Sequence, residues 1–195
     1  MKIYPRTGDA GDTGLFGGER TRKDDPRVCA YGAVDEANAA IGFAAAAPDL
    51  PKEIAERLMG IMSDLFDVGS ELASPPSAGE KLGKKLDTAV DAARVKELEA
   101  LIDAVDAEVP ALTHFVLPTG TDACGRLHMA RAAVRRAERD IVTLARDVAP
   151  GQASPVRGEL LVYVNRLSDL LFAWSRLCNH RGGKGDVAWR AKKNR

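Results

Sequence analysis

The chain has 195 residues, of which 45% are hydrophobic and 29% charged, so we expect one domain with a sizeable hydrophobic core rather than a disordered segment. Lysine plus arginine and aspartate plus glutamate each number 28, and the zero net charge removes any global electrostatic case for a nucleic-acid or membrane partner. Aromatic residues are only 5% whereas alanine is abundant, which favours close-packed helices over a β-sandwich.

The cysteines and the apolar patterning indicate the compartment. Cys29, Cys124 and Cys178 lie far apart, and an odd number without CxxC spacing fits neither a disulfide framework nor a zinc site. The first residues lack the apolar segment of a secretory signal, and no apolar run approaches the ~20 residues that a membrane helix needs. We therefore expect a soluble, cytoplasmic protein.

Residues 5–26 are rich in glycine and charge and show no helical period, so we expect an ordered loop or short extended pieces there. Glycines let a backbone approach a ligand and present N–H groups to an anion, and Thr7, Thr13 and Lys23 could add hydroxyls and an ammonium group. The phosphate-binding motifs GxxxxGK[ST] and GxGxxG are absent, so an anion-binding loop and a simple turn both stay open.

Five later segments carry hydrophobic residues at steps of three and four, which is typical of amphipathic helices. We expect these helices at about 28–47, 54–72, 90–108, 122–147 and 156–180, with Thr121 or Asp122 as the cap of the fourth. Residues 74–87 and 114–123 are expected to be loops, and the tail after residue 180 to be loosely ordered. With no convincing strand and no repeat, the economical architecture is a single-domain, all-α bundle of five helices.

The fourth helix carries the strongest chemical signal. Arg131, Arg135 and Glu138 fall within a narrow sector beside its apolar stripe, whereas Arg136 points elsewhere. Arginines beside a core seam are costly to desolvate unless they meet an anion, which Glu138, Asp35 or a triphosphate could supply. An exposed charged helix face is the alternative, because that is the common use of such a pattern.

The final helix has apolar residues on two faces. Asn165, Ser168 and Phe172 share a face almost opposite the main apolar seam, and Leu161 lies beside them. A helix with one solvent-exposed side does not need Leu161 and Phe172 there. A subunit interface, a ligand floor and a fully internal helix all remain open explanations.

Three blocks of sequence together carry a resemblance to a known family. They are RTGDAGDTGLFGGER…KDDPRVCAYGAVDEAN, FVLPTGTDACGRLHMARAAVRRAER and YVNRLSDLLFAWSR, in this order and spanning nearly the whole chain. With these blocks the chain resembles the ATP:cob(I)alamin adenosyltransferases of the propanediol-utilisation type. The resemblance implies a homotrimer of five-helix bundles in which ATP and a corrinoid bind between neighbouring subunits.

The resemblance also implies a reaction. Cobalt(I) of a base-off cobalamin attacks the ribose 5′-carbon of ATP, adenosylcobalamin forms and triphosphate leaves, so the protein needs no nucleophile of its own. Mg²⁺ is expected with the triphosphate. A reductase that supplies cobalt(I) and an adenosylcobalamin-dependent enzyme are possible partners. The alternatives are an ATP- or corrinoid-binding carrier of the same fold without turnover, and a structural helical assembly protein.

Matching motif positions imply the roles of individual residues. Residues 1–27 form the ATP-binding loop, residues 28–180 the bundle and residues 181–195 the tail. The residues implied in nucleotide binding are Arg6, Thr7, Gly8, Thr13, Gly14 and Lys23 in the loop, Arg135, Arg136, Glu138 and Arg139 in the fourth helix, and Asn165 in the last. The implied catalytic set is Arg135, Phe115 below the cobalt, and Arg131 paired with Asp35 of a neighbouring subunit.

Two positions depart from the family pattern. Pro5 replaces a threonine and so lacks both its hydroxyl and a backbone N–H. Thr121 replaces the second glycine of the middle loop. If that position needs a positive φ, Thr121 will be strained or the loop will differ.

Overall fold

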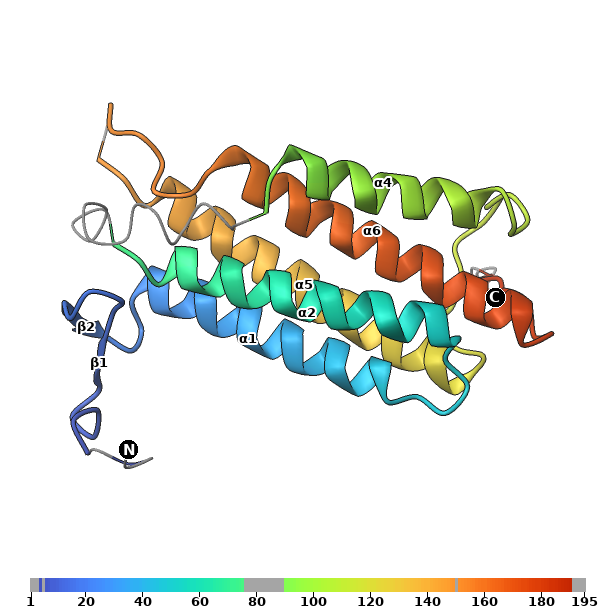
Figure 1. Cartoon of the computed structure of the whole chain (residues 1–195), viewed down its shortest axis with the longest axis horizontal. Helices are drawn as coiled ribbons and strands as arrows, with labels where there is room; N and C mark the ends of the chain where they lie inside the picture. The colour runs from blue at the N-terminus through green and yellow to red at the C-terminus, as the bar shows by residue number, and fades with distance from the viewer. Residues whose placement is uncertain (1–3, 5, 76–89, 150, 191–195) are drawn as a thin grey trace, which may run out of the picture.

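The computed structural model describes residues 4, 6–75, 90–149 and 151–190, and its described part consists of a five-helix bundle with a short N-terminal hairpin (Figure 1). The elements are β1 (Asp12–Gly14), β2 (Arg20–Arg22), α1 (Pro26–Ala45), α2 (Lys52–Leu72), α4 (Ala92–Asp106), α5 (Asp122–Arg146) and α6 (Gly158–Arg181). The five predicted helices are confirmed. Pro5, residues 191–195 and most of the predicted 74–87 loop lie outside the described residues.

The helices begin where local side chains satisfy their first backbone N–H groups. Asp25 caps α1 by accepting a 2.8 Å hydrogen bond from the N–H of Arg27, and Pro26 takes the first helical position, where no N–H is needed. Of the two candidates for the cap of α5, Thr121 performs it by accepting from the N–H of Cys124 at 3.1 Å. Asp91 caps α4 in the same way.

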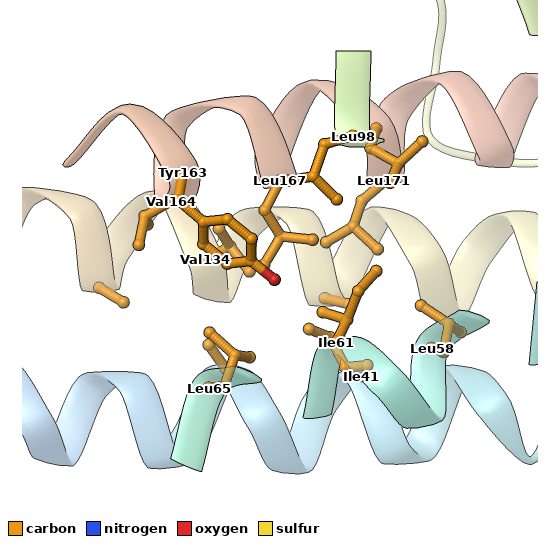
Figure 2. Close-up of a cluster of buried hydrophobic side chains, with 14 of the residues drawn as sticks. Ile41, Leu58, Ile61, Leu65, Leu98, Val134, Tyr163, Val164, Leu167 and Leu171 are labelled. Carbon is orange, nitrogen blue, oxygen red and sulfur yellow. The ribbon is translucent and has the colours of Figure 1, made fainter. Parts of the chain in front are cut away.

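The core lies where α1 and α2 face α5 and α6, and α4 covers the other side of α6. Figure 2 shows Ile41, Leu58, Leu65, Val134 and Leu167 among the side chains that meet there. They are buried in the positions that the three- and four-residue steps predict. Replacing one of the leucines with alanine is expected to cost about 2–5 kcal/mol of stability.

One polar group enters this core with its partners. The Tyr163 hydroxyl donates a 2.7 Å hydrogen bond to Asp64, which is also paired with Arg94. Burial and the nearby negative charge of Asp64 raise the pKa of Tyr163, so the phenol stays neutral and donates. This network joins α2, α4 and α6.

The expectation of short extended pieces within residues 5–26 is confirmed, although these pieces pair as strands that the reading of the chain as strandless left out. There, β1 and β2 form a short antiparallel hairpin in which Thr13 lies opposite Thr21. The connecting turn has positive φ at Gly17 (105°) and Gly18 (92°), a conformation that glycine adopts without a Cβ clash. Strands of three residues are too short to show an alternating apolar pattern.

The expectation of a loosely ordered tail is wrong for its described part. An antiparallel bridge joins Ala188 to Val116, and the Trp189 N–H donates to the Phe115 carbonyl at 2.7 Å. The tail therefore lies against the loop that joins α4 to α5. Within the described residues, no helix combines the length and apolar composition that spanning a membrane requires.

Candidate functional site

The predicted loop residues lie in the N-terminal hairpin or directly beside it, with Thr13 and Gly14 in β1. The backbone N–H of Lys23 donates to the Gly11 carbonyl at 2.8 Å, and Arg20 donates to the Thr7 carbonyl at 2.6 Å. Thr7 and Lys23 have exposed side chains, whereas Thr13 is half-buried. The hairpin is thus ordered by its own hydrogen bonds while its hydroxyl and ammonium groups remain accessible.

Two backbone positions shape this loop. Arg6 has a φ of 63°, in the left-handed region that costs a non-glycine residue of the order of 1 kcal/mol. A Cβ at Gly8 would lie 3.2 Å from the Asp12 carbonyl oxygen and 3.4 Å from Nζ of Lys23. Glycine at this position therefore lets the ammonium group lie close to the loop backbone. Gly14 has no neighbour within 4 Å of such a Cβ.

The hairpin is attached to the C-terminal end of α2. The N–H of Phe16 donates to the Ala73 carbonyl at 3.0 Å, and the buried guanidinium of Arg27 donates to the carbonyls of Leu72 and Ser74 at 2.7 and 3.2 Å. Sequence analysis missed Arg27, because its acceptors are backbone carbonyls far away in the chain. Its contacts fix where the loop leaves the bundle.

Arg131 and Arg135 of α5 are among the arginines of this helix that have no acidic partner within the described residues. Arg131 is half-buried with its Nε–H unpartnered, and its Cζ lies 5.8 Å from the centre of the Phe172 ring. Burial lowers the pKa of the Arg131 guanidinium, and the nearby positive charge of Arg135 lowers it further. Arg135 is exposed, and Arg139 donates to its backbone carbonyl at 3.1 Å. This part of α5 therefore offers positive charge to an external anion.

The other charged residues of the motif have partners within the chain. Arg136 pairs with Glu36 of α1. Glu138 accepts a 2.9 Å hydrogen bond from the side-chain amide of Asn165, which holds α5 to α6. Of the three anions that sequence reasoning left open for Arg131, Glu138 is therefore engaged elsewhere.

Asp35 and Arg131 do not meet within one chain. Asp35 is exposed and lines a groove between α1 and α2, together with Phe16 and Phe66. The next residue, Glu36, is directed toward α5 through its pair with Arg136. The chain therefore presents the acid on a different face of α1 from the one that packs on α5.

Phe115 is not a core anchor. Its side chain is 79% exposed, and its ring meets that of Trp189 edge to face with 6.3 Å between centroids. Trp189 is itself 51% exposed, so the two rings form an accessible aromatic pair at the end of the bundle. Sequence analysis missed Trp189 because only the tertiary pairing of the tail with the α4–α5 loop reveals it.

The loop that leads from Phe115 into α5 is held by Asn179 of α6. The Asn179 side chain accepts from the N–H of Thr121 at 2.9 Å and donates to the Thr119 carbonyl at 3.0 Å. Gly120 has a φ of 142°, and a Cβ there would lie 2.0 Å from the Asn179 side-chain oxygen. Thr121 has a φ of −73°, so the strain considered for it does not arise and its hydroxyl caps α5.

The second face of α6 is partly covered within the chain. Ser168 is buried, Leu161 is half-buried against the core, and Phe172 contacts His128 and Arg131 of α5. Asn165 remains exposed. Among the described residues, no group of three or more His, Cys, Asp or Glu side chains is placed to hold a metal ion.

Comparison with known proteins identifies the family. The family model for cobalamin adenosyltransferase matches residues 3–178. The chain is 39% identical over 192 residues to a cobalamin adenosyltransferase of Cupriavidus metallidurans, covering 98% of this chain and 96% of the relative. It is 40% identical over 193 residues to a corrinoid adenosyltransferase of Bacillus subtilis, covering 97% and 92%.

Solved structures agree with the sequence relatives. A variant of the PduO-type ATP:corrinoid adenosyltransferase from Lactobacillus reuteri, complexed with cobalamin and ATP, superposes with a TM-score of 0.86. The two sequences are 35% identical, and the match covers 97% of this chain and 100% of the other. A second variant of that enzyme, complexed with ATP, has a TM-score of 0.85 at 34% identity, with 96% and 100% covered. This chain belongs to the cobalamin adenosyltransferase family.

Proposed function

We propose that this chain transfers the 5′-deoxyadenosyl group of ATP to the cobalt of cob(I)alamin, giving adenosylcobalamin and triphosphate. The observation that carries the assignment to this site is the half-buried Arg131, whose Nε–H has no partner among the described residues, with the exposed Arg135 one turn further along the same helix. A folded chain leaves a charge such as that of Arg131 beside its core when an anion completes it.

The arginines serve the leaving group. Cobalt(I) donates an electron pair to the ribose 5′-carbon, the cobalt–carbon bond forms, and the bond from that carbon to the triphosphate oxygen breaks. The triphosphate gains negative charge in this step, so a guanidinium fixed nearby stabilises the transition state more than the ground state. We assign this role to Arg135, with Arg136 and Arg139 around the phosphates and ribose.

The binding site is completed between subunits. Figure 1 places the N-terminal hairpin and the loop between α4 and α5 at opposite ends of the bundle. Within the described residues of one chain Arg131 has no acidic partner, and the exposed Asp35 lines a groove on a different face of α1, so a neighbouring copy is needed to bring the two charges together. We therefore propose a homotrimer in which the hairpin of one subunit covers ATP held by α5 of its neighbour.

The same arrangement gives Asp35 its role. In the assembled trimer Asp35 of one subunit pairs with Arg131 of the next, which supplies the missing anion beside the core seam. The exposed rings of Phe16 and Phe66, beside Asp35, then become part of the buried interface.

The aromatic pair serves the corrinoid. We propose that Phe115, supported by Trp189, excludes water and the corrinoid's own base from the lower face of cobalt. Loss of an axial ligand makes cobalt(II) easier to reduce, so these rings act before the alkyl transfer. A reductase that supplies cobalt(I) and an adenosylcobalamin-dependent enzyme are the partners that we propose upstream and downstream of this step.

Two further assignments complete the proposal. We assign Mg²⁺ to the phosphate oxygens of ATP, which are ligands that this ion prefers, and derive no step from it. A cytoplasmic location agrees with three cysteines that are all free thiols.

The decisive experiment mixes the protein with ATP, Mg²⁺ and chemically reduced cobalamin and follows the cobalt–carbon product by its absorption spectrum. We expect product with ATP and none in the matched sample without it. A carrier without turnover would instead bind ATP and form no product. Binding itself is measured as thermal stabilisation, which reaches about 2.7 kcal/mol when ATP is at 100 times its Kd. Absence of both signals would exclude enzyme and carrier together.

A further inference from the structure

His128 is a buried polar residue that the proposed reaction has not used. It lies on α5 one helical turn before Arg131, and only 6% of its surface is exposed. Its ring packs edge to face on Phe172 of α6, with 6.0 Å between centroids. The same Phe172 ring lies 5.8 Å from Cζ of Arg131. His128 and Arg131 therefore flank one aromatic side chain.

The hydrogen bonds of Ser175 determine which nitrogen of His128 carries the proton. The Ser175 hydroxyl has a single hydrogen and donates it to the Phe172 carbonyl at 2.7 Å. The same oxygen lies 3.2 Å from Nε2 of His128, so in this contact the imidazole must be the donor. His128 is thus protonated on Nε2 and presents a bare lone pair at Nδ1.

The imidazole is neutral as well as oriented. Burial lowers the pKa of His128 to about 4, and the positive charge of Arg131 contributes to the lowering. A second proton would place two positive charges beside one another on the same helix face. Nδ1 therefore remains a hydrogen-bond acceptor at neutral pH.

Two complementary polar atoms beside Phe172 have no hydrogen-bond partner among the described residues. Nδ1 of His128 is buried and accepts no hydrogen bond from the described residues, and Nε–H of Arg131 is buried and donates none. Residues three apart on a helix are neighbours on its surface, at roughly 5–6 Å between Cβ atoms. One atom is an acceptor without a donor, and the other is a donor without an acceptor.

We propose that His128 is a positioning residue for Arg131, whose Nε–H donates to Nδ1 of His128 when the site is assembled. This inference rests on the proposed function, because the hydrogen bond forms when a bound anion attracts the terminal nitrogens of Arg131 away from the core. With Nε held by His128, both terminal nitrogens remain free to engage the triphosphate or the acid of a neighbouring subunit. Ser175 contributes by fixing the tautomer.

Two substitutions separate the hydrogen bonds of His128. His128→Gln places an amide N–H near the position of Nε2 and keeps the bond to Ser175, but it removes the acceptor at Nδ1. His128→Asn places an amide oxygen near Nδ1 and loses the bond to Ser175. We expect His128→Gln to lower kcat/KM for ATP about tenfold and His128→Asn to retain most of the activity.

The same variants in an Arg131→Lys background test the coupling. Lysine has no N–H at the position of Nε, so His128→Gln should then cause almost no additional loss. A packing role predicts something different, namely that Gln and Asn lower thermal stability alike and that each effect adds to that of Arg131→Lys. That additive result would overturn the proposal.

A measurement without turnover keeps the test independent of the reaction. With ATP bound, ¹⁵N NMR of His128 should show a proton on Nε2 and an Nδ1 resonance shifted by an accepted hydrogen bond. This shift should disappear in Arg131→Lys. An Nδ1–H tautomer, or an Nδ1 resonance that the substitution leaves unchanged, overturns the positioning role even where adenosyl transfer proceeds normally. Conversely, the expected shift in a protein that makes no adenosylcobalamin would reject the proposed reaction and keep the His128–Arg131 bond.

Discussion

The arginines of α6 and those of α5 are neutralised differently. In α6, Arg166 pairs with Glu99 of α4, Arg176 with Asp186 of the tail, and Arg181 with both Glu53 of α2 and Glu108 just after α4. The hydrogen bonds that Arg181 donates to Glu108 and Glu53 raise its pKa.

In α5, Arg131 meets an aromatic ring instead of an acid, and burial lowers its pKa. The contrast teaches that acids of this chain pair with the arginines that hold α6 to its surroundings. Arg131 and Arg135 have no such acid among the described residues and are left to a ligand or a neighbouring subunit, whereas Arg136 is paired with Glu36.

The largest effect expected from this contrast is at Arg135. Arg135→Ala should lower turnover about 10²–10³-fold, the range found when one preorganised donor to a developing anion is removed. Circular dichroism should be unchanged because the side chain is exposed. Arg181→Ala is the matched control in α6. Its half-exposed ion pairs are expected to contribute only about 0–1 kcal/mol each, and turnover should persist. Equal losses in both variants would remove the distinction between the two helices.

The second expected effect is at Phe115, which separates reduction from alkyl transfer. Phe115→Ala should slow adenosylation severely when cobalt(II) and a physiological-type reductant are supplied, and much less when cobalt(I) is supplied ready-made. Stability should fall by no more than about 1.5 kcal/mol, because the ring is largely exposed and loses chiefly its contact with Trp189. Thermal unfolding and activity from both cobalt states provide the measurements. A loss of about 3–5 kcal/mol with unchanged activity would assign Phe115 to packing instead.

The third effect tests whether a neighbouring subunit supplies the acid that α5 lacks. Asp35→Asn and Arg131→Ala should impair activity and trimer formation similarly, since each leaves the other charge buried without a partner. In the double variant their effects should be non-additive, with a coupling energy of about 0.5–3 kcal/mol. Analytical ultracentrifugation and initial rates measure the two consequences. Simple additivity, or a monomer at micromolar concentration, would contradict the pair.

The smallest effect is a pH dependence of stability that originates in the α5–α6 seam. The pKa of His128 falls from 6.5 to about 4 on folding because the neutral ring is buried. The unfolded chain therefore binds this proton first, and the stabilisation present above pH 6.5 is lost as the pH falls toward 4. Denaturant unfolding across this range should show a steeper decline for the wild type than for His128→Asn. Parallel curves would mean that other groups account for the acid sensitivity.

The sequence predicts the helices well because each helix carries its own periodic signal. The steps of three and four along α2 specify a buried stripe without any knowledge of its neighbours, and position alone narrows the cap of α5 to Thr121 or Asp122. Short extended pieces were expected at the N-terminus, but their pairing as a hairpin was not, because β1 and β2 are each three residues long and their turn depends on the φ angles of Gly17 and Gly18.

Features that depend on distant contacts could not be predicted in this way. The role of Trp189 follows from pairing with a loop more than one helix away in sequence, and that of Arg27 from carbonyls at the end of α2. Helical geometry already groups Arg131 with Arg135 and directs Arg136 elsewhere, but only the structure shows that Glu36 of α1 pairs with Arg136. The pairing of Asp35 with Arg131 remains a prediction, because it needs a second copy of the chain.

The close fit between Gly120 and Asn179 has a mechanical consequence. Lys184 of the tail donates from its backbone N–H to the Asn179 carbonyl and from Nζ to the Gly120 carbonyl, so loop, helix and tail are fastened at one point. A methyl group added at Gly120 would displace Asn179 and, through it, the tail that carries Trp189. The alignment of the aromatic pair thus depends on Gly120, a residue that touches neither ring. An alanine at Gly120 would shift Phe115 and Trp189 relative to the bundle rather than leave a cavity between them.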